Sequence, residues 1–225
     1  MTNTLIIAVD GLAATGKGTL ARRIAAELDF AYLDTGLLYR AVGHALLVSG
    51  KDPADPKAAV AAAKMLGMTE SADPELLRSD EVGQAASKAS VIPEVRSSLL
   101  KFQQDFAASP PDGKKGAVLD GRDIGTVIAP HAPIKIFVTA RPEIRAHRRF
   151  LELQERGENV TEATILADME ARDKRDQERA IAPAVPAEDA VILDTSSLDR
   201  DEVFRKALLI VEEKLKLLED TQDKL

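Results

Sequence analysis

GLAATGKGT, residues 11–19, decides the fold of this chain. The stretch follows an apolar run, residues 5–9, that predicts a buried strand, and it precedes residues 20–28, which predict an amphipathic helix. A glycine-rich turn between a strand and a helix holds backbone N–H groups around a cavity of phosphate size, and the lysine adds a full positive charge. The sequence therefore predicts that a nucleoside triphosphate binds by its phosphates to Gly11, Leu12, Ala13, Ala14, Thr15, Gly16, Lys17, Gly18 and Thr19.

The spacing within this turn departs in one place from the usual G-x-x-x-x-G-K-[ST] pattern. Gly18 displaces the hydroxyl residue by one position, so Thr19 becomes the candidate that supplies a hydroxyl near a metal ion. The alternative is a turn that merely needs glycine, and the strand before it and the helix after it disfavour that reading.

Composition limits the remaining possibilities. The 225 residues suffice for one large domain, and the absence of cysteine excludes disulfides, a thiol nucleophile and cysteine metal sites. A net charge of −7 disfavours broad nucleic-acid binding. The first apolar run is too short for a signal peptide and no run reaches the length of a membrane span, so we expect a cytoplasmic protein with no membrane partner. The three histidines, at positions 44, 131 and 147, show no metal-ligand spacing.

Strand and helix patterns alternate along the chain. Apolar runs without clean alternation predict buried parallel strands at residues 5–9, 30–33, 117–119, 134–138 and 190–193. Helical patterns cover residues 37–48, 58–65, 94–107, 142–156, 162–179 and 201–218. This order predicts an α/β fold with a parallel sheet. The interval between the second and third strands predicts a helical insertion, and the two charged helices between the last two strands predict a helical hairpin that serves as a lid.

Polar residues follow two of the predicted strands. Thr35, Tyr39 and Arg40 come after the second strand, at the sheet edge where open α/β sheets bind ligands. Asp120 and its neighbours Arg122 and Asp123 follow the third strand, where an acidic residue often orients magnesium-bound water. The plainer alternatives are a helix cap at residues 34–36 and a surface ion pair at residues 120–123.

A third polar group lies in the predicted hairpin. Arg172, Asp176 and Arg179 have i, i+4 and i+7 spacing and therefore share one helical face. By itself this is typical of a solvated salt-bridge stripe. Beside a triphosphate, however, guanidinium groups stabilise the negative charge that spreads over the oxygens during phosphoryl transfer.

Five blocks of the sequence together resemble the bacterial cytidylate kinases, a family of nucleoside monophosphate kinases. The blocks are residues 11–19, 34–40, 120–126, 172–176 and 180–187. The resemblance implies transfer of the γ-phosphate of ATP to CMP or dCMP, with magnesium as cofactor. It implies the three-layer P-loop NTPase fold, with a five-stranded parallel sheet, a helical monophosphate-binding insertion and a helical lid. Nothing in the sequence demands a partner chain, so a monomer is expected.

The resemblance also divides the chain and assigns its site residues. It implies a single domain over residues 1–225, with a core of 1–35, 110–141 and 180–220, an insertion of 36–109 and a lid region of 142–179. Cytosine contacts fall to Ser87, Arg96 and Asp123, with Thr35 nearby. The phosphates fall to Arg40, Arg122 and Arg179, and the sugar to Arg172 and Asp176. Lys17, Arg122 and Arg179 are the implied catalytic residues, and Tyr39 and Asp120 complete the substrate site.

Two departures from the family pattern are visible. Thr15 and Ala14 stand where the family often carries alanine and glycine, which makes the loop less permissive. Residues 65–79 lack the strand pattern of the small antiparallel sheet that the family's insertion usually holds.

Two alternatives of different class remain at this point. One is another small-molecule kinase of the same fold that acts on a different nucleotide or metabolite. The other is a nucleotide-gated switch, although the chain has no guanine-reading Asn-Lys-x-Asp motif.

Overall fold

The computed structural model describes residues 4–66 and 74–222 of the chain. Its strands are β1 (Leu5–Gly11), β2 (Ala31–Asp34), β3 (Gly116–Gly121), β4 (Ile134–Thr139) and β5 (Val191–Asp194). Its helices are α1 (Lys17–Glu27), α2 (Thr35–Val48), α3 (Pro56–Met65), α4 (Pro74–Leu77), α5 (Asp80–Ala89), α6 (Pro93–Ala108), α7 (Pro142–Glu155), α8 (Glu162–Glu178) and α9 (Arg200–Gln222). A 3₁₀ turn, η1 (Pro111–Gly113), and a π-helical turn, η2 (Ile124–Ile128), complete the described elements.

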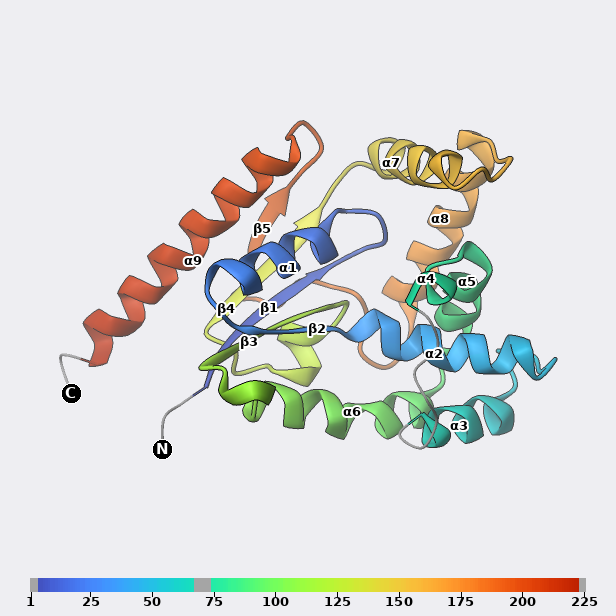
Figure 1. Cartoon of the computed structure of the whole chain (residues 1–225), viewed down its shortest axis with the longest axis horizontal. Coiled ribbons are helices and arrows are strands. Elements are labelled where there is room, and N and C mark those ends of the chain that lie inside the picture. Colours follow the sequence, from blue (N-terminus) through green and yellow to red (C-terminus); the bar gives the residue numbers. More distant parts are fainter. Residues whose placement is uncertain (1–3, 67–73, 223–225) are drawn as a thin grey trace.

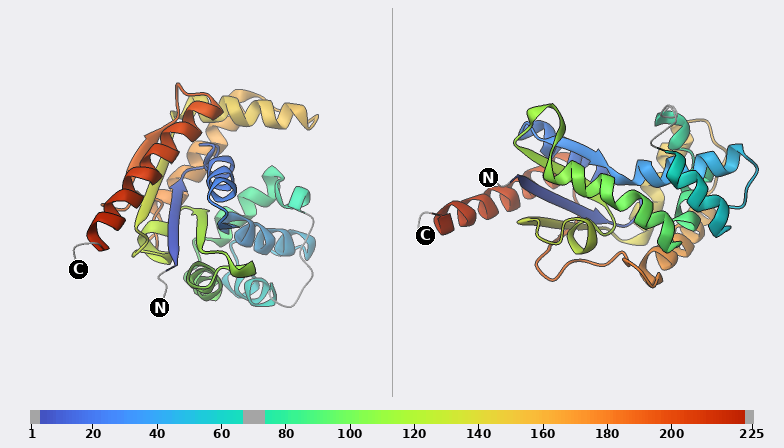
Figure 2. Two further views of the ribbon diagram at one scale, coloured as in Figure 1. Left: turned by 60° about the vertical axis from the view of Figure 1, so that its left-hand side comes forward. Right: turned by 90° about the horizontal axis from the view of Figure 1, so that it is seen from below.

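The five strands form one parallel sheet in the order β2-β3-β1-β4-β5. Side chains of the central strand β1 alternate, so Ile7 and Val9 pack with α1 and α9 on one face. Ile6 and Ala8 pack with α6 and η2 on the other face. The result is a three-layer fold, in which α9 lies along the sheet (Figures 1 and 2). The expected α/β class and the five expected strands are confirmed.

Helices α2 to α6 form the insertion between β2 and β3 (Figure 1). They share an apolar cluster of their own, built around Val42, Leu46, Val95 and Leu99. Within the described residues of this insertion no strand occurs, which confirms its helical character. Part of the 65–79 segment lies outside the described residues, at 67–73.

Helices α4 and α5 have no counterpart in the sequence analysis. Ser79 caps α5, because its hydroxyl accepts a hydrogen bond from the Val82 amide at 3.3 Å. The helix packs against α2 at Gly43, where an added Cβ would lie 2.7 Å from the Ala86 amide nitrogen. Small residues on both helices therefore allow an unusually close approach.

Helices α7 and α8 form the expected hairpin. Ala146, Leu153, Ile165 and Met169 make its apolar centre, and Ala14 of the glycine-rich loop packs against this cluster. The hairpin thus rests on the loop between β1 and α1 and also lies beside α5 (Figure 1).

Candidate active site

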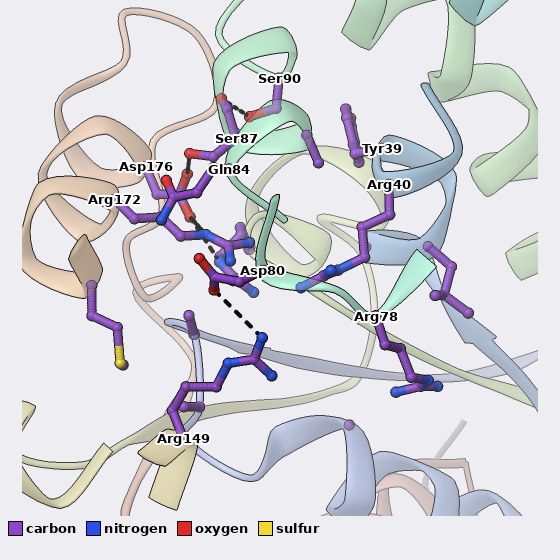
Figure 3. A pocket seen from close by; sticks show the side chains of 18 of the residues that line it. Tyr39, Arg40, Arg78, Asp80, Gln84, Ser87, Ser90, Arg149, Arg172 and Asp176 are labelled. Atoms are coloured by element: carbon purple, nitrogen blue, oxygen red, sulfur yellow. Dashed lines mark hydrogen bonds and ion pairs between the residues drawn. The ribbon is translucent and has the colours of Figure 1, made fainter. Parts of the chain in front are cut away.

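A cavity of about 310 Å³ opens at the carboxyl ends of β1, β2 and β3. Loop residues Ala13, Ala14, Lys17 and Gly18 line one part of it. Every residue that the sequence analysis assigned to the substrate also lines it: Thr35, Tyr39, Arg40, Ser87, Arg96, Asp120, Arg122, Asp123, Arg172, Asp176 and Arg179. Figure 3 shows Tyr39 and Arg40 on α2, Ser87 on α5, and Arg172 and Asp176 on α8, together with Arg149 on α7.

The glycine-rich loop has the strand–turn–helix geometry that its sequence predicts. Gly16 adopts a left-handed conformation with φ of 87°, and α1 begins at the next residue. At Gly11 an added Cβ would lie 2.2 Å from the Val138 carbonyl oxygen, so no side chain fits there. Ala14 also has a positive φ, of 56°, at the position where the resemblance leads us to expect glycine. The backbone therefore keeps a glycine-like shape despite the alanine.

The loop residues do not all face the cavity. Leu12, Thr15 and Gly16 belong to the turn but do not line the cavity, and the Thr15 hydroxyl donates to the Leu12 carbonyl at 3.1 Å. Thr19 is exposed on α1 and likewise does not line the cavity. The structure thus does not bring Thr19 together with the other predicted site residues.

Two arginines of α7 hold the loop from outside. Arg145 is buried and its Nη1 donates to the Ala13 carbonyl at 3.2 Å, while its Nη2 pairs with Asp173 of α8 at 2.6 Å. Arg148 donates to the carbonyl of Thr195 at 2.7 Å, and the Thr195 hydroxyl donates to the Thr15 carbonyl at 3.2 Å. The sequence analysis did not single out these two arginines.

Asp120 explains the unusual glycine after Lys17. The Tyr32 hydroxyl donates to Asp120 Oδ2 at 2.7 Å, and an added Cβ at Gly18 would lie only 3.2 Å from that same oxygen. A serine or threonine at this position would press against the carboxylate. Burial raises the pKa of Asp120.

Lys17 is the first residue of α1, and its ammonium donates a hydrogen bond to the Leu12 carbonyl at 3.4 Å. Burial, followed by repulsion from Arg122, lowers the pKa of Lys17 to about 8. Asp120 and Asp34 oppose this shift. A bound polyphosphate would stabilise the ammonium because it adds negative charge.

Arginines crowd the middle of the cavity. Burial and then repulsion from Arg172 lower the pKa of Arg40 to about 10, and burial with repulsion from Arg122 lowers the pKa of Arg172. Gly83 makes this crowding possible, since a Cβ there would lie 2.9 Å from Arg40 Nη2 and 3.3 Å from Arg172 Nη1. Buried cations that repel one another favour an anionic ligand.

Acidic residues hold the arginines on the far side of the cavity. Arg96 Nη2 pairs with Asp123 Oδ2 at 2.5 Å, and Arg179 Nη2 lies 3.6 Å from Asp123 Oδ1. The Arg96 guanidinium also lies over the Tyr39 ring, 5.3 Å from its centroid. Arg179 Nη2 is buried without a hydrogen-bond acceptor, as is Nε of Arg172. Both side chains line the cavity.

A second network joins the insertion to the hairpin. Asp176 of α8 accepts from the Ser87 hydroxyl at 3.3 Å and from Arg122 Nε at 3.1 Å. Although burial alone would raise it, the pKa of Asp176 falls below its usual value because Arg122 and Arg172 surround the carboxylate. Arg175 and Gln84, which the sequence analysis did not single out, pair beside it at 2.7 Å.

This geometry agrees with the comparisons to known proteins. The family model described as cytidylate kinase matches residues 7–213. The chain belongs to the cytidylate kinase family. A cytidylate kinase of Paramagnetospirillum magneticum is 60% identical over 206 residues, which cover 92% of this chain and 97% of that protein. A cytidylate kinase of Rhodospirillum rubrum is 56% identical over 210 residues, covering 93% and 98%.

The resemblance drawn from the sequence motifs is therefore confirmed. A crystal structure of an uncharacterized protein from Eubacterium ventriosum shares the fold, with a TM-score of 0.51 at 15% identity over 95% of this chain and 99% of that one. Family membership also favours the kinase over the nucleotide-gated switch.

Within residues 4–66 and 74–222, no helix combines the length and the apolar character that a bilayer crossing requires.

Proposed function

We propose that this chain transfers the γ-phosphate of ATP to CMP or dCMP, in one step and within the single cavity described above. The overall reaction follows from membership of the cytidylate kinase family. The observation that supports the site is the continuity of the cavity: the glycine-rich loop and the arginine cluster line one space. Donor and acceptor phosphates can therefore meet without a covalent enzyme intermediate.

The glycine-rich loop holds the donor in this proposal. Its amides and the start of α1 surround the β- and γ-phosphates, and Lys17 adds a positive charge. The hydrogen bonds from Arg145 to the Ala13 carbonyl and from Thr195 to the Thr15 carbonyl fix the loop before ATP arrives. Such preorganisation makes the electrostatic stabilisation effective.

Magnesium fits this site as a companion of the ATP phosphates. Among the described residues no three acidic, histidine or cysteine side chains gather to hold a metal ion. This agrees with an ion that takes most of its oxygens from phosphates and water and needs one or two carboxylates. Asp120, beside Gly18 and Lys17, is the residue that would hold it, whereas the exposed Thr19 lies outside the cavity. When bound, the ion would neutralise charge on the phosphates.

Residues of the insertion, β3 and α8 hold the acceptor. Asp123 accepts from the amino group of cytosine and Arg96 donates to the ring, while Ser87 and Thr35 line the same cavity. Asp176 and Arg172 hold the sugar. Arg40, Arg122 and Arg179 hold the phosphate, whose oxygen attacks the γ-phosphate in line. Buried polar partners of this kind reject a mismatched base strongly.

The α7–α8 hairpin acts as the lid. It carries Arg172 and Asp176, and Arg149 of α7 approaches Asp80 of α5 at 3.4 Å, so the hairpin already touches the insertion (Figure 3). Closure excludes water, which prevents hydrolysis of ATP, and brings guanidinium groups onto the transferring phosphoryl group.

We keep the division of the chain into a core, an insertion at residues 36–109 and a lid at residues 142–179. The terminal residues of the single domain, 1–3 and 223–225, lie outside the described part of the chain. The expectation of a monomer stays a prediction. The expected cytoplasmic location likewise stays a prediction.

An ADP-release assay over a panel of nucleoside monophosphates tests this function. We expect fast release with CMP and dCMP, slower release with UMP, and background release without an acceptor. Lys17→Met serves as the inactive control for the same preparation. ATP hydrolysis that is independent of any monophosphate would contradict the proposal, and so would a clear preference for a purine monophosphate.

A further inference from the structure

Asp10 has a buried carboxylate and belongs neither to the phosphate loop nor to the proposed acceptor residues. It lies at the end of β1, immediately before Gly11, and is only 5% exposed. Its Oδ1 accepts a hydrogen bond from the Ile124 amide and its Oδ2 accepts one from the Gly125 amide, both at 2.8 Å. Both oxygens are thus committed to the backbone of another segment.

That segment begins directly after the acceptor residues. Ile124 and Gly125 open η2, and Asp123 precedes this turn without capping it through its own side chain. Strand pairing places Asp10 opposite Gly121, and its carboxylate binds the amides of Ile124 and Gly125. Arg122 and Asp123 lie between these two points of attachment. One side chain therefore links the start of the phosphate loop to the backbone that carries the base- and phosphate-binding residues.

We propose that Asp10 is a positioning residue for the acceptor site: its ionised carboxylate holds the η2 backbone so that Arg122 and Asp123 face CMP. This inference rests on the proposed function, because it takes Arg122 and Asp123 as the acceptor contacts. Asp10 itself touches neither substrate. Its loss should therefore weaken CMP binding and leave the intrinsic affinity for ATP nearly unchanged.

The charges around Asp10 make its ionisation accessible to experiment. Burial raises its pKa to about 6, against the two amide hydrogen bonds that lower it. Asp123 raises the pKa further and Arg122 lowers it. From β4, the aliphatic part of Lys135 approaches Gly125, but its ammonium is bound to the Pro130 carbonyl and to Asp189.

The sign of the pH effect follows from the hydrogen bonds. Above pH 6 the ionised carboxylate accepts from both amides, whereas protonation converts one acceptor oxygen into a donor that meets an N–H group. Affinity for CMP should therefore fall as pH decreases through about 6. The phosphate of CMP also titrates near pH 6, so wild type alone does not isolate the effect.

Asp10→Asn isolates it, because the amide keeps the size and supplies one acceptor oxygen at every pH. At about pH 8 we expect the KM for CMP to rise about tenfold, with the KM for ATP within about twofold of wild type. At about pH 5.5 the ratio of the two KM values for CMP should shrink to about threefold, since wild type is then mostly protonated. A ratio that stays constant with pH, or equal changes in both KM values, would overturn the inference.

A measurement on the unmodified protein covers the case in which Asp10→Asn does not fold. NMR titration of the Asp10 carboxyl carbon gives its pKa with and without saturating CMP. Tenfold tighter binding to the ionised form requires CMP to lower this pKa by about one, by thermodynamic linkage. Direct repulsion by the anionic ligand would instead raise it. An unchanged or raised pKa would therefore overturn the positioning role.

Asp123→Ala separates this inference from the proposed function. If that variant binds CMP as well as wild type does, the assignment of the acceptor site fails, and the role of Asp10 fails with it. If Asp123→Ala loses CMP affinity while Asp10→Asn keeps it at all pH values, the positioning role alone fails.

Discussion

Replacement of Asp123 by alanine tests the buried ion pair at the base-binding end of the cavity. The Arg96 and Asp123 side chains are 9% and 5% exposed, and their charged atoms lie 2.5 Å apart. Arg179, which lies 3.6 Å from the other carboxylate oxygen, loses the same partner. The substitution therefore leaves two buried guanidinium groups without their shared counter-charge.

The magnitude follows from the cost of an uncompensated buried charge. Removal of one partner of a buried pair costs about 3–5 kcal/mol of unfolding free energy. For a chain of this length, 1 kcal/mol shifts Tm by about 2–4 °C, so Asp123→Ala should lower Tm by about 6–20 °C. Loss of a charged hydrogen bond to the cytosine should raise the KM for CMP about 10- to 150-fold.

Thermal unfolding and the ADP-release assay measure the two effects on the same protein. The exposed pair of Lys101 and Asp105, at 2.7 Å with side chains 83% and 62% exposed, provides a matched control. Asp105→Ala should cost less than about 1 kcal/mol and leave CMP kinetics unchanged. In Asp123→Ala, a Tm loss below about 2 °C, or unchanged discrimination between CMP and UMP, would refute the reasoning.

Four further outcomes are expected. Lys17→Met should lower turnover at least about 10²-fold while Tm is retained, and near-normal turnover would exclude its role at the phosphates. Because the pKa of Lys17 is lowered to about 8, deprotonation should raise the KM for ATP as pH increases above that value, and a flat profile up to about pH 9.5 would contradict this. Gly43→Ala should lower the free energy of unfolding by about 1–3 kcal/mol, as calorimetry would show. It should raise the KM for CMP rather than the KM for ATP, because α5 carries Ser87. An unchanged Tm would argue against the close contact between α2 and α5. Ala14→Gly should relieve the positive φ of 56° and stabilise the fold by up to about 1 kcal/mol, and a lower Tm would speak against strain at this residue.

Local sequence patterns predicted the strands and the phosphate loop well, because both depend on residues that are neighbours in the sequence. The strands are short apolar runs bounded by turns, and the phosphate loop needs Gly11 and Gly16 for its backbone shape. Both signals are visible without knowledge of any distant segment. The same holds for the α7–α8 hairpin, whose two helical patterns are separated by Gly157.

The misses have equally specific reasons. Helix α5 buries mostly alanine, serine and glycine, with Val82 as its one larger buried side chain, so large apolar residues do not mark it, and its partner Gly43 lies in a different helix. Thr19 was assigned to the metal from motif spacing. Its role at the metal stays a prediction: each further helical residue rotates by about 100°, so Lys17 and Gly18 line the cavity while Thr19 is exposed to solvent.

The sequence by itself determined that this chain has a phosphate-binding loop on a parallel sheet, and its motifs indicated the family. Only the tertiary structure decided which charged residues share one desolvated space. Arg122 meets Asp176, 54 positions further along the chain, and Asp10 reaches the amide of Gly125 across 115 positions. A charge acquires such a partner only when packing removes water around both, and that depends on elements that no local pattern connects.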